Sequence, residues 1–338
     1  MVFYGFLAQE CNMQRVYRQS LRAALIGAAI FLAGCHSKNP GTATTHPAAA
    51  AKGASKKWVI GMSQCTLGEP WRVQMDADIK KAARKYPSLK IIFKDAQNSV
   101  LQQRAQIAEF VQSGVNLIIV SPKETAPLTE PLAKAYQAGI PVIVLDRAVL
   151  GNQYTCFIGA SNTAIGRAAG KWIVNKLHGK GNVVELEGSM TSSPGQERNA
   201  GFRQAIKGTD IHVIYTADMK WQQSIARREM ESALTRFPDI NLVYAANDPG
   251  AYGAYLAAKA AGRAKKIIFV GIDGLPSLGL AYIAQGYLDA TFRYPTCGRH
   301  AIAAAWKILH GQKVPKRITL PSRLFTKKNL AEGGQPLP

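Results

Sequence analysis

The sequence lacks the features that mark several classes of protein. Its one long apolar run lies near the N-terminus, which excludes a polytopic membrane protein. The five cysteines form no Cys-x-x-Cys pair and lie near no His cluster, which argues against a structural zinc site. Charged residues make up 19% of the chain and hydrophobic residues 47%, a balance that excludes intrinsic disorder and a coiled coil. At roughly 150 residues per domain, the 338 residues are expected to form two domains.

The N-terminus has the pattern of an export signal. Three arginines precede the apolar run 23–31, which is too short to span a bilayer comfortably. The next four residues, Leu32-Ala33-Gly34-Cys35, resemble the bacterial lipoprotein box. The resemblance implies that residues 1–34 are a signal peptide and that Cys35 becomes the lipid-bearing N-terminus, anchored to a bacterial membrane in the periplasm or cell envelope. A plain signal peptide with an incidental cysteine is the alternative.

Acidic residues are scarce in this chain. It has 42 Lys or Arg and 21 Asp or Glu, a net charge of +21. Nucleic acid is the usual partner of such a charge, but an exported protein rarely meets it and no recognition motif appears, so we expect no nucleic-acid partner. The basic residues are scattered along the sequence, which favours a solvated surface; attraction to anionic lipid is the alternative. Residues 35–57 have no apolar periodicity and are expected to be a flexible tether.

From Trp58 onward, apolar strand-like runs alternate with helix-like runs in two successive arrays. Nearly continuous apolar strands are typical of a parallel sheet that is covered on both faces. We therefore predict an α/β protein with two doubly wound, Rossmann-like lobes and a cleft between them. The expected strands are 59–62, 90–93, 117–120, 141–145, 183–186, 213–215, 242–244, 267–270 and 290–292. The expected helices are 71–86, 101–113, 126–138, 163–177, 195–206, 222–236, 250–261 and 276–285.

Ligands of doubly wound folds bind beyond the carboxyl ends of the strands, so the residues after each strand are the candidate site. Nearly every strand end offers an Asp, an Asn, an Arg or a large aromatic ring. Such groups suit a sugar, because its hydroxyls both donate and accept hydrogen bonds and its C–H faces pack on aromatic rings. The candidates are Trp71, Arg72, Ser121, Asp146, Arg147, Arg198, Asn247, Asp273 and Tyr294.

Each of these residues also has a purely structural interpretation. Asn247 and the following Asp248 stand where a helix N-cap is common. Asp146 and Arg147 could form an ion pair between loops, and Trp71 could belong to the core. Arg198 could be a surface charge on its helix. The functional interpretation depends on their occurrence together at equivalent strand ends.

Four stretches resemble the periplasmic sugar-binding proteins of ABC transporters, in the ribose-binding-like group with the type I periplasmic binding protein fold. The stretches are Ile143–Arg147, Gly195–Phe202, Ala246–Asp248 and Val270–Gly274. The resemblance implies crossovers near 158–161, 292–295 and 320–323, which form a three-segment hinge. It also implies an N-terminal lobe of residues 58–160 with 295–322 and a C-terminal lobe of residues 161–294 with 323–330.

The same resemblance implies roles for the candidate residues. Ligand-contacting positions fall on Asp146, Arg147, Arg198, Asn247 and Asp273. An aromatic stacking position falls on Trp71, with Arg72 beside it, and a polar position on Ser121, whereas Tyr294 stands where a polar residue such as Gln can appear. The sequence departs from the pattern at Met219, where an aromatic residue is common. Whether Trp221, two residues further on, takes the place of that aromatic residue is left open. The lost aromatic faces and the added arginine favour a larger, substituted or anionic sugar over plain ribose.

The predicted function is capture of a monosaccharide, a related polyol or a sugar acid by hinge closure, and its delivery to an ABC transporter permease. A sensor that presents the bound sugar to a chemoreceptor or sensor kinase is the alternative. No G-x-G-x-x-G, H-E-x-x-H or G-x-S-x-G motif occurs, so we expect no enzyme, no cofactor and no metal. The protein is expected to be a monomer, and Cys65, Cys156 and Cys297 allow at most one disulfide.

Overall fold

The structure is a computed structural model that describes residues 57–338. The expected signal peptide 1–34, the lipid attachment at Cys35 and all but the last residue of the expected tether 35–57 lie outside the described residues. In the part of the chain that is described, no helix is long and apolar enough to cross a membrane.

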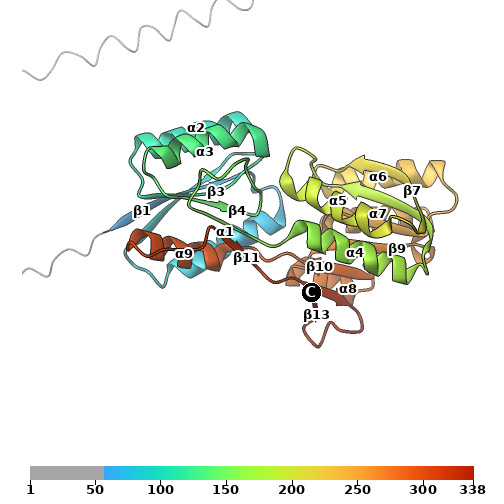
Figure 1. Ribbon diagram of the computed structural model, residues 1–338. Coiled ribbons are helices and arrows are strands. Elements are labelled where there is room, and N and C mark those ends of the chain that lie inside the picture. The colour runs from blue at the N-terminus through green and yellow to red at the C-terminus, as the bar shows by residue number, and fades with distance from the viewer. Residues whose placement is uncertain (1–56) are drawn as a thin grey trace, which may run out of the picture. The chain divides into compact units, whose positions relative to one another are not determined.

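The first sheet has six parallel strands in the order β11-β5-β4-β3-β1-β2. Helices α2 and α3 cover one face of this sheet, and α1 and α9 cover the other (Figure 1). The strands are β1 (Trp58–Gln64), β2 (Leu89–Asp95), β3 (Leu117–Ser121), β4 (Val142–Leu145), β5 (Cys156–Gly159) and β11 (Arg317–Thr319). The helices are α1 (Pro70–Ala83), α2 (Val100–Gln112), α3 (Thr125–Gln137) and α9 (Gly298–Leu309).

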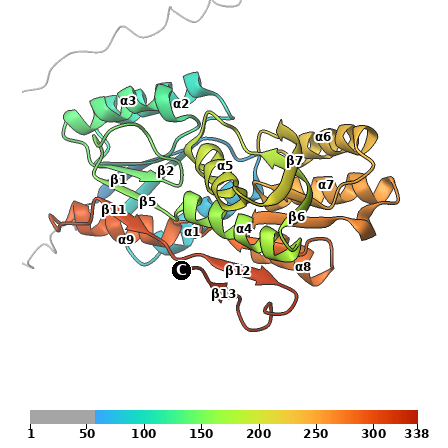
Figure 2. The ribbon, with the colours of Figure 1, turned by 45° about the vertical axis from the view of Figure 1, so that its right-hand side comes forward.

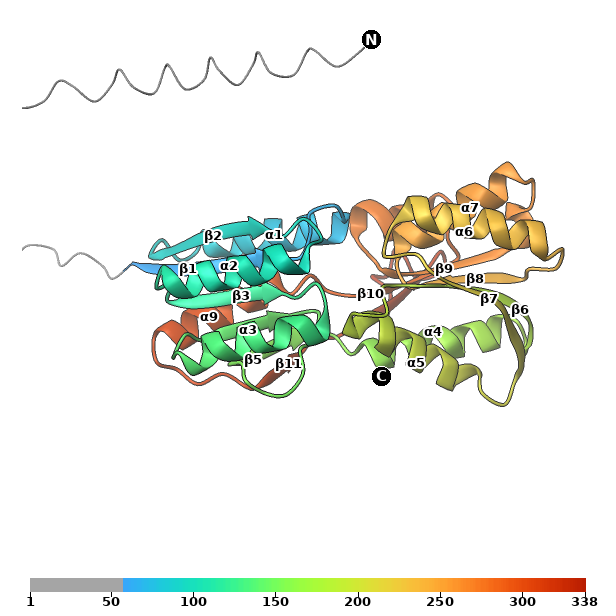
Figure 3. The same ribbon diagram turned by 90° about the horizontal axis from the view of Figure 1, so that it is seen from above.

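The second sheet has seven strands in the order β13-β12-β10-β9-β8-β6-β7, of which β12 and β13 are antiparallel to their neighbours. Helices α4 and α5 lie on one face, and α6 and α7 on the other (Figure 3). The strands are β6 (Lys180–Glu187), β7 (Asp210–Asp218), β8 (Leu242–Ala245), β9 (Ile268–Asp273), β10 (Ala290–Arg293), β12 (Arg323–Thr326) and β13 (Gln335–Pro336). The helices are α4 (Asn162–Lys176), α5 (Ser193–Ile206), α6 (Gln223–Arg236), α7 (Asp248–Ala260) and α8 (Ala281–Ala284).

The chain passes between the sheets three times, after β5, after β10 and after β11. The last part of the chain therefore contributes β11 to the first sheet and then β12 and β13 to the second (Figure 2). Central strands such as β3 and β4 are wholly buried, which explains their unbroken apolar sequences. The predicted α/β class with two doubly wound sheets is confirmed by this topology.

Several elements have no counterpart in the sequence prediction. The segment expected only as a crossover contains β5, and α9, β11, β12 and β13 were not anticipated. The expected helix 276–285 is a π-helical turn, Pro276–Leu280, followed by the short α8. Strands β11 and β13 have only three and two residues, which is too few to show a pattern. Helix α9 does bury a regular apolar stripe of Ala301, Ile302, Ala305 and Leu309, a pattern that sequence reasoning could have used.

The three described cysteines, Cys65, Cys156 and Cys297, are buried free thiols. Burial raises the pKa of Cys156 to about 11, so this side chain stays protonated and unreactive at neutral pH. None of the three forms the single disulfide that the sequence allowed.

A buried carboxyl on β6 makes stability depend on pH. Glu185 is 1% exposed; Asn199 Nδ2 donates to its Oε1 at 3.0 Å, and Arg203 Nη2 lies 2.5 Å from its Oε2. Burial raises the pKa of Glu185 from 4.5 to about 7, although Arg203 opposes the shift. The folded pKa lies above the unfolded one, so this contribution to stability is complete below about pH 4.5 and is lost as the pH rises through about 7.

Between pH 5 and pH 8 the Glu185 carboxyl should lower the free energy of unfolding by an amount on the order of 3 kcal/mol. We expect Glu185→Gln to remove this decrease, because glutamine does not ionise. Denaturant titrations of both proteins across this range measure the effect. Glu229→Gln is the control, because among the described residues the half-buried Glu229 accepts a hydrogen bond only from the Tyr215 hydroxyl. An unchanged pH slope in Glu185→Gln would contradict the assignment.

Candidate functional site

A small cavity of about 20 Å³ lies where strand ends from both sheets meet. It is lined by Glu69, Trp71, Arg72, Asp146, Pro194, Arg198, Trp221, Asn247 and Asp273. These residues follow β1, β4, β6, β7 and β8 or end β9, as expected for the ligand edge of parallel sheets. Six of the predicted residues therefore line one cavity, and the other three, Ser121, Arg147 and Tyr294, contact its lining.

Arg72 organises the side of the cavity that belongs to the first sheet. Its Nη1 donates to Ser121 Oγ at 2.6 Å and its Nη2 to Asp146 Oδ2 at 2.8 Å. Its Nε lies 3.4 Å from Glu69 Oε2. Both Arg72 and Asp146 are almost fully buried, and Asp146 has a left-handed backbone with φ of 62°. This fork holds the Asp146 carboxylate at the cavity wall.

Arg147 lies deeper, with 1% of its surface exposed. Its Nη1 donates to the Lys123 carbonyl at 2.9 Å, and its Nη2 is 3.7 Å from Glu69 Oε1. Its Nε is 3.9 Å from Asp146 Oδ2, which is too long for a hydrogen bond. The guanidinium carbon lies 5.6 Å from the ring centre of Trp221, a cation–π distance. The suggested ion pair between Asp146 and Arg147 is present, but at a long separation and without a hydrogen bond.

Arg198 organises the opposite side, on α5. Its Nε donates to Asn162 Oδ1 at 2.9 Å and its Nη1 to the Ala246 carbonyl at 2.5 Å, with Asp273 Oδ1 3.6 Å away. Its guanidinium carbon is 5.4 Å from the ring of Trp221 and 5.1 Å from that of Tyr294. Arg198 is 3% exposed, so it is not a surface charge.

A glycine sets the position of Arg198. A Cβ at Gly166 on α4 would lie 2.2 Å from the Arg198 carbonyl oxygen. Only glycine therefore lets α4 approach the α5 backbone closely enough to bring Asn162 within reach of Arg198.

Asn247 caps α7, as its structural interpretation predicts. Its Oδ1 accepts from the Gly250 amide at 2.8 Å, while its Nδ2 donates to the Trp221 carbonyl at 3.1 Å. The neighbouring Asp248 is wholly structural, since it accepts from Thr291 Oγ1 at 2.6 Å and from the Gly274 amide at 2.8 Å. Asn247 nevertheless lines the cavity, so it serves as a cap and as a wall.

Asp273 ends β9 with an unusual backbone, φ 125°, in a buried position. Burial raises the pKa of its carboxyl well above the usual value, and Arg198 opposes this only in part. A raised pKa lets the carboxyl keep its proton to higher pH than a free carboxyl, and in that form it can donate as well as accept a hydrogen bond.

Two aromatic residues join the sheets beside the cavity. Trp71 Nε1 donates to the Tyr294 carbonyl at 3.0 Å, and the two rings meet edge to face at 5.6 Å. The Tyr294 hydroxyl lies 3.4 Å from the Asp146 carbonyl. Trp71 lines the cavity although it also packs in the core, so its two interpretations are compatible.

Trp221 is the aromatic residue that sequence reasoning left open. Met219 is fully buried beneath Gly250, whose Cβ position lies 2.1 Å from its sulfur. Lys220 and Trp221 both have left-handed backbones, φ 51° and 65°, and the Trp221 ring lies at the cavity. Sequence reasoning also missed Glu69, which looked like part of a helix entry, and Pro194, for which no signal exists.

Several buried donors around the cavity have no hydrogen-bond partner among the described residues: Arg72 Nε, Arg147 Nε, Arg147 Nη2 and Trp221 Nε1. An unsatisfied buried donor costs about 1–3 kcal/mol, so such groups are rare in folded proteins. Arg72 and Trp221 line the small cavity and Arg147 lies against Trp221, so these donors lie close to where the oxygen atoms of a ligand would be.

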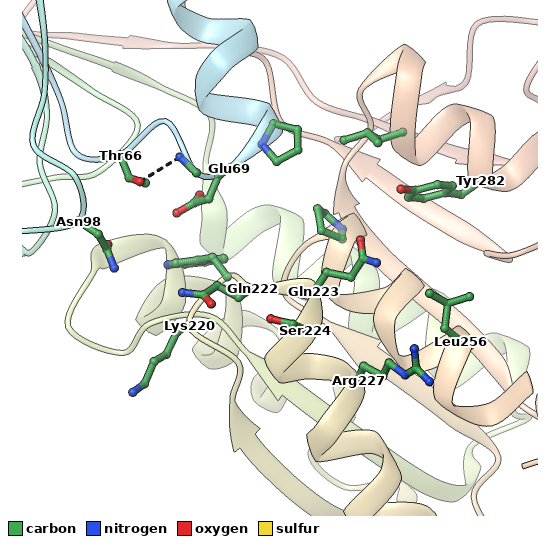
Figure 4. Close-up of a pocket in the computed structure, with 15 residues that line it drawn as sticks. Thr66, Glu69, Asn98, Lys220, Gln222, Gln223, Ser224, Arg227, Leu256 and Tyr282 are labelled. Atoms are coloured by element: carbon green, nitrogen blue, oxygen red, sulfur yellow. Dashed lines mark hydrogen bonds between the residues drawn. The ribbon is translucent and has the colours of Figure 1, made fainter. Parts of the chain in front are cut away.

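A larger cavity of about 680 Å³ adjoins the small one and shares Glu69 and Trp221 with it (Figure 4). Its lining mixes amide and hydroxyl side chains with apolar ones, together with Lys220, Arg227 and Tyr282. Thr66 Oγ1 accepts from the Gly68 amide at 3.0 Å and so holds the loop before Glu69. Glu69 and Trp221 therefore form the wall between the inner cavity and the outer one.

Comparisons with known proteins agree with this architecture. A family model described as a periplasmic binding protein domain matches residues 60–313. The ribose import binding protein RbsB of Bacillus subtilis (strain 168) is 32% identical over 82% of this chain and 90% of its own length. The galactofuranose-binding protein YtfQ of Escherichia coli (strain K12) is 30% identical over 77% of this chain and 85% of its own.

Among solved structures, the fructose binding periplasmic domain of a hybrid two component system is 42% identical. It superposes with a TM-score of 0.79 over 82% of this chain and 93% of its own. Similarity at this level covers both sheets.

Proposed function

Because this chain belongs to the periplasmic binding protein family, with the type I fold, we propose that it captures a sugar between its two sheets. The ligand class is a monosaccharide, a related polyol or a sugar acid. The proposed lobes are residues 58–160 with 295–322 and residues 161–294 with 323–330. The protein would deliver its ligand to an ABC transporter permease, as a monomer held to a bacterial membrane through Cys35.

The unpaired buried donors carry this proposal. Arg72, Arg147 and Trp221 have four buried nitrogen atoms without hydrogen-bond partners among the described residues. Arg72 and Trp221 line the cavity, and Arg147 lies against the Trp221 ring. Hydroxyl or carboxylate oxygens of a sugar would accept from them and remove their desolvation cost. The carboxyl of Asp273 and the carboxylates of Asp146 and Glu69 would accept from sugar hydroxyls, and Trp71 and Trp221 offer faces to its C–H groups.

The size of the cavity supports hinge closure. A volume of about 20 Å³ accommodates roughly one water, whereas small-molecule pockets occupy about 300–1,000 Å³. Contacts between segments of the two sheets surround it, including Ala148 N to Ser193 Oγ at 2.8 Å and Thr125 N to the Thr191 carbonyl at 3.1 Å. A sugar would enter only when these contacts part, and closure would then be stabilised by ligand bonds to both lobes.

We expect a ligand found by thermal shift among pentoses, hexoses, polyols and sugar acids to compact the protein. A saturating ligand raises the free energy of unfolding by about 2.7 kcal/mol at a hundred times its Kd. Small-angle X-ray scattering should then show a smaller radius of gyration with that ligand than without it. An unchanged radius with ligand bound would contradict closure, and no stabilisation by any of these compounds would contradict sugar binding.

A sensory role is the second candidate. It is favoured by the 42% identity to a periplasmic domain of a hybrid two component system. Deletion of the gene distinguishes the roles: an importer subunit is needed for uptake of the labelled sugar, whereas a sensor is needed only for the response to it.

A further inference from the structure

Two segments around the first sheet are rich in positive charge, although the basic residues look scattered in the sequence. Residues 79–94 and 298–317 together contain eleven Lys or Arg and no Asp or Glu. They include the second half of α1 and all of α9, which pack against each other (Figure 1). More than half of the net charge of +21 therefore lies in two adjoining segments.

A groove of about 420 Å³ between α1 and α9 brings the charges together. Its lining includes the exposed cations Lys81, Lys85 and Arg299, together with His300. Asp78 is the one carboxylate in the lining, and it is occupied by hydrogen bonds from Thr296 and Gln74. None of the three cations forms an ion pair among the described residues.

Half-buried aromatic rings continue the groove toward the start of the described chain. Tyr86 stacks on Trp306 with ring centres 4.6 Å apart, and Trp306 lies 3.8 Å from the ring of His310. His310 in turn meets Trp58 at 6.1 Å. Amphipathic aromatic rings beside lysine and arginine are typical of surfaces that lie at the headgroup level of a bilayer.

The position of Trp58 supports the same occupant. Trp58 is the first residue of β1, so the chain that precedes the folded part enters at the end of this face. We propose that the α1–α9 face, defined by Lys81, Lys85, Arg299, Tyr86 and Trp306, docks on an anionic phospholipid surface. The cations would lie on the phosphates and the rings at the interface, independently of any bound sugar.

The test uses the full chain with Cys35→Ser, so that no lipid can be attached there. Its partition onto vesicles of phosphatidylcholine mixed with phosphatidylglycerol is measured by co-sedimentation. Vesicles of phosphatidylcholine alone measure the binding that does not depend on the anionic lipid. About 1 kcal/mol per basic residue corresponds to roughly fivefold per charge. Lys81→Gln/Lys85→Gln/Arg299→Gln should thus lower the phosphatidylglycerol-dependent partition on the order of a hundredfold.

The matched control removes three exposed charges near the second sheet, Lys259→Gln/Lys265→Gln/Lys266→Gln, and should change the partition only a few-fold. Hydrogen exchange should show protection of α9 on the mixed vesicles. Equal losses in both triple variants would overturn the proposal in favour of diffuse attraction. No preference for phosphatidylglycerol would also overturn it and would point to an acidic protein as the partner of this face.

Discussion

Arg198→Ala should weaken sugar binding by roughly a thousandfold. The substitution removes a charged donor from the cavity wall and leaves Asp273 and Asn162 without the guanidinium beside them. Hydrogen bonds to charged groups are worth about 1.5–3 kcal/mol, and each unpaired buried partner costs a similar amount. A loss of about 4 kcal/mol corresponds to a thousandfold in Kd. Calorimetric titration with the ligand identified by thermal shift measures the change.

The folded state should survive this substitution with a smaller loss. Arg198 also binds the Ala246 carbonyl, so we expect a decrease in Tm of several degrees. Arg198→Lys keeps the charge near Asp273 but cannot form both bonds of the guanidinium, and it should bind sugar with intermediate affinity. Arg167→Ala is the control, because Arg167 is exposed on α4 and bonds only to Gln204. Normal binding by Arg198→Ala would show that the site lies elsewhere.

The arrangement of the strands explains why much of the site could be predicted. Buried parallel strands have unbroken apolar sequences, so their ends are visible in the sequence. Parallel strands also present their carboxyl ends at one edge, so residues after different strands converge. Asp146, Asn247 and Asp273 occupy such positions and line the same cavity. The sequence therefore indicates both where these residues lie along the chain and which edge of the sheet they occupy.

What could not be predicted depends on backbone conformation and on distant packing. Trp221 reaches the cavity through two successive left-handed residues, which neither Lys220 nor Trp221 favours intrinsically. Glu69 faces Arg72 three residues along the chain, but its contact with Arg147 joins segments about 80 residues apart. The clustering of cations on the α1–α9 face likewise requires the packing of segments about 200 residues apart in the chain. None of these contacts leaves a periodic pattern in the sequence.

Arg147→Met should weaken sugar binding about a hundredfold while making the unliganded protein more stable. The Nε and Nη2 atoms of Arg147 are buried and have no hydrogen-bond partner among the described residues, and Glu69 and Asp146 lie too far away to compensate fully. Methionine has a similar length and would fill the space beneath Trp221 without unpaired donors. Replacing unsatisfied buried polar groups with apolar ones of similar shape is commonly neutral or stabilising.

Opposite changes in stability and binding distinguish a binding residue from a structural one. We expect Tm to rise by roughly 2–4 °C, as about 1 kcal/mol does in a domain of this size, and affinity to fall on the order of a hundredfold. Met75→Leu, at a buried position of the same lobe outside the cavity lining, should leave the affinity unchanged. If Arg147→Met instead lowers Tm strongly, Arg147 is a structural cation between Glu69, Asp146 and the Lys123 carbonyl, and its donors are not reserved for a ligand. Scanning calorimetry and titration of one preparation decide between a binding role and a structural role of Arg147. Donors whose removal stabilises the protein and weakens sugar binding are accounted for only by a bound ligand.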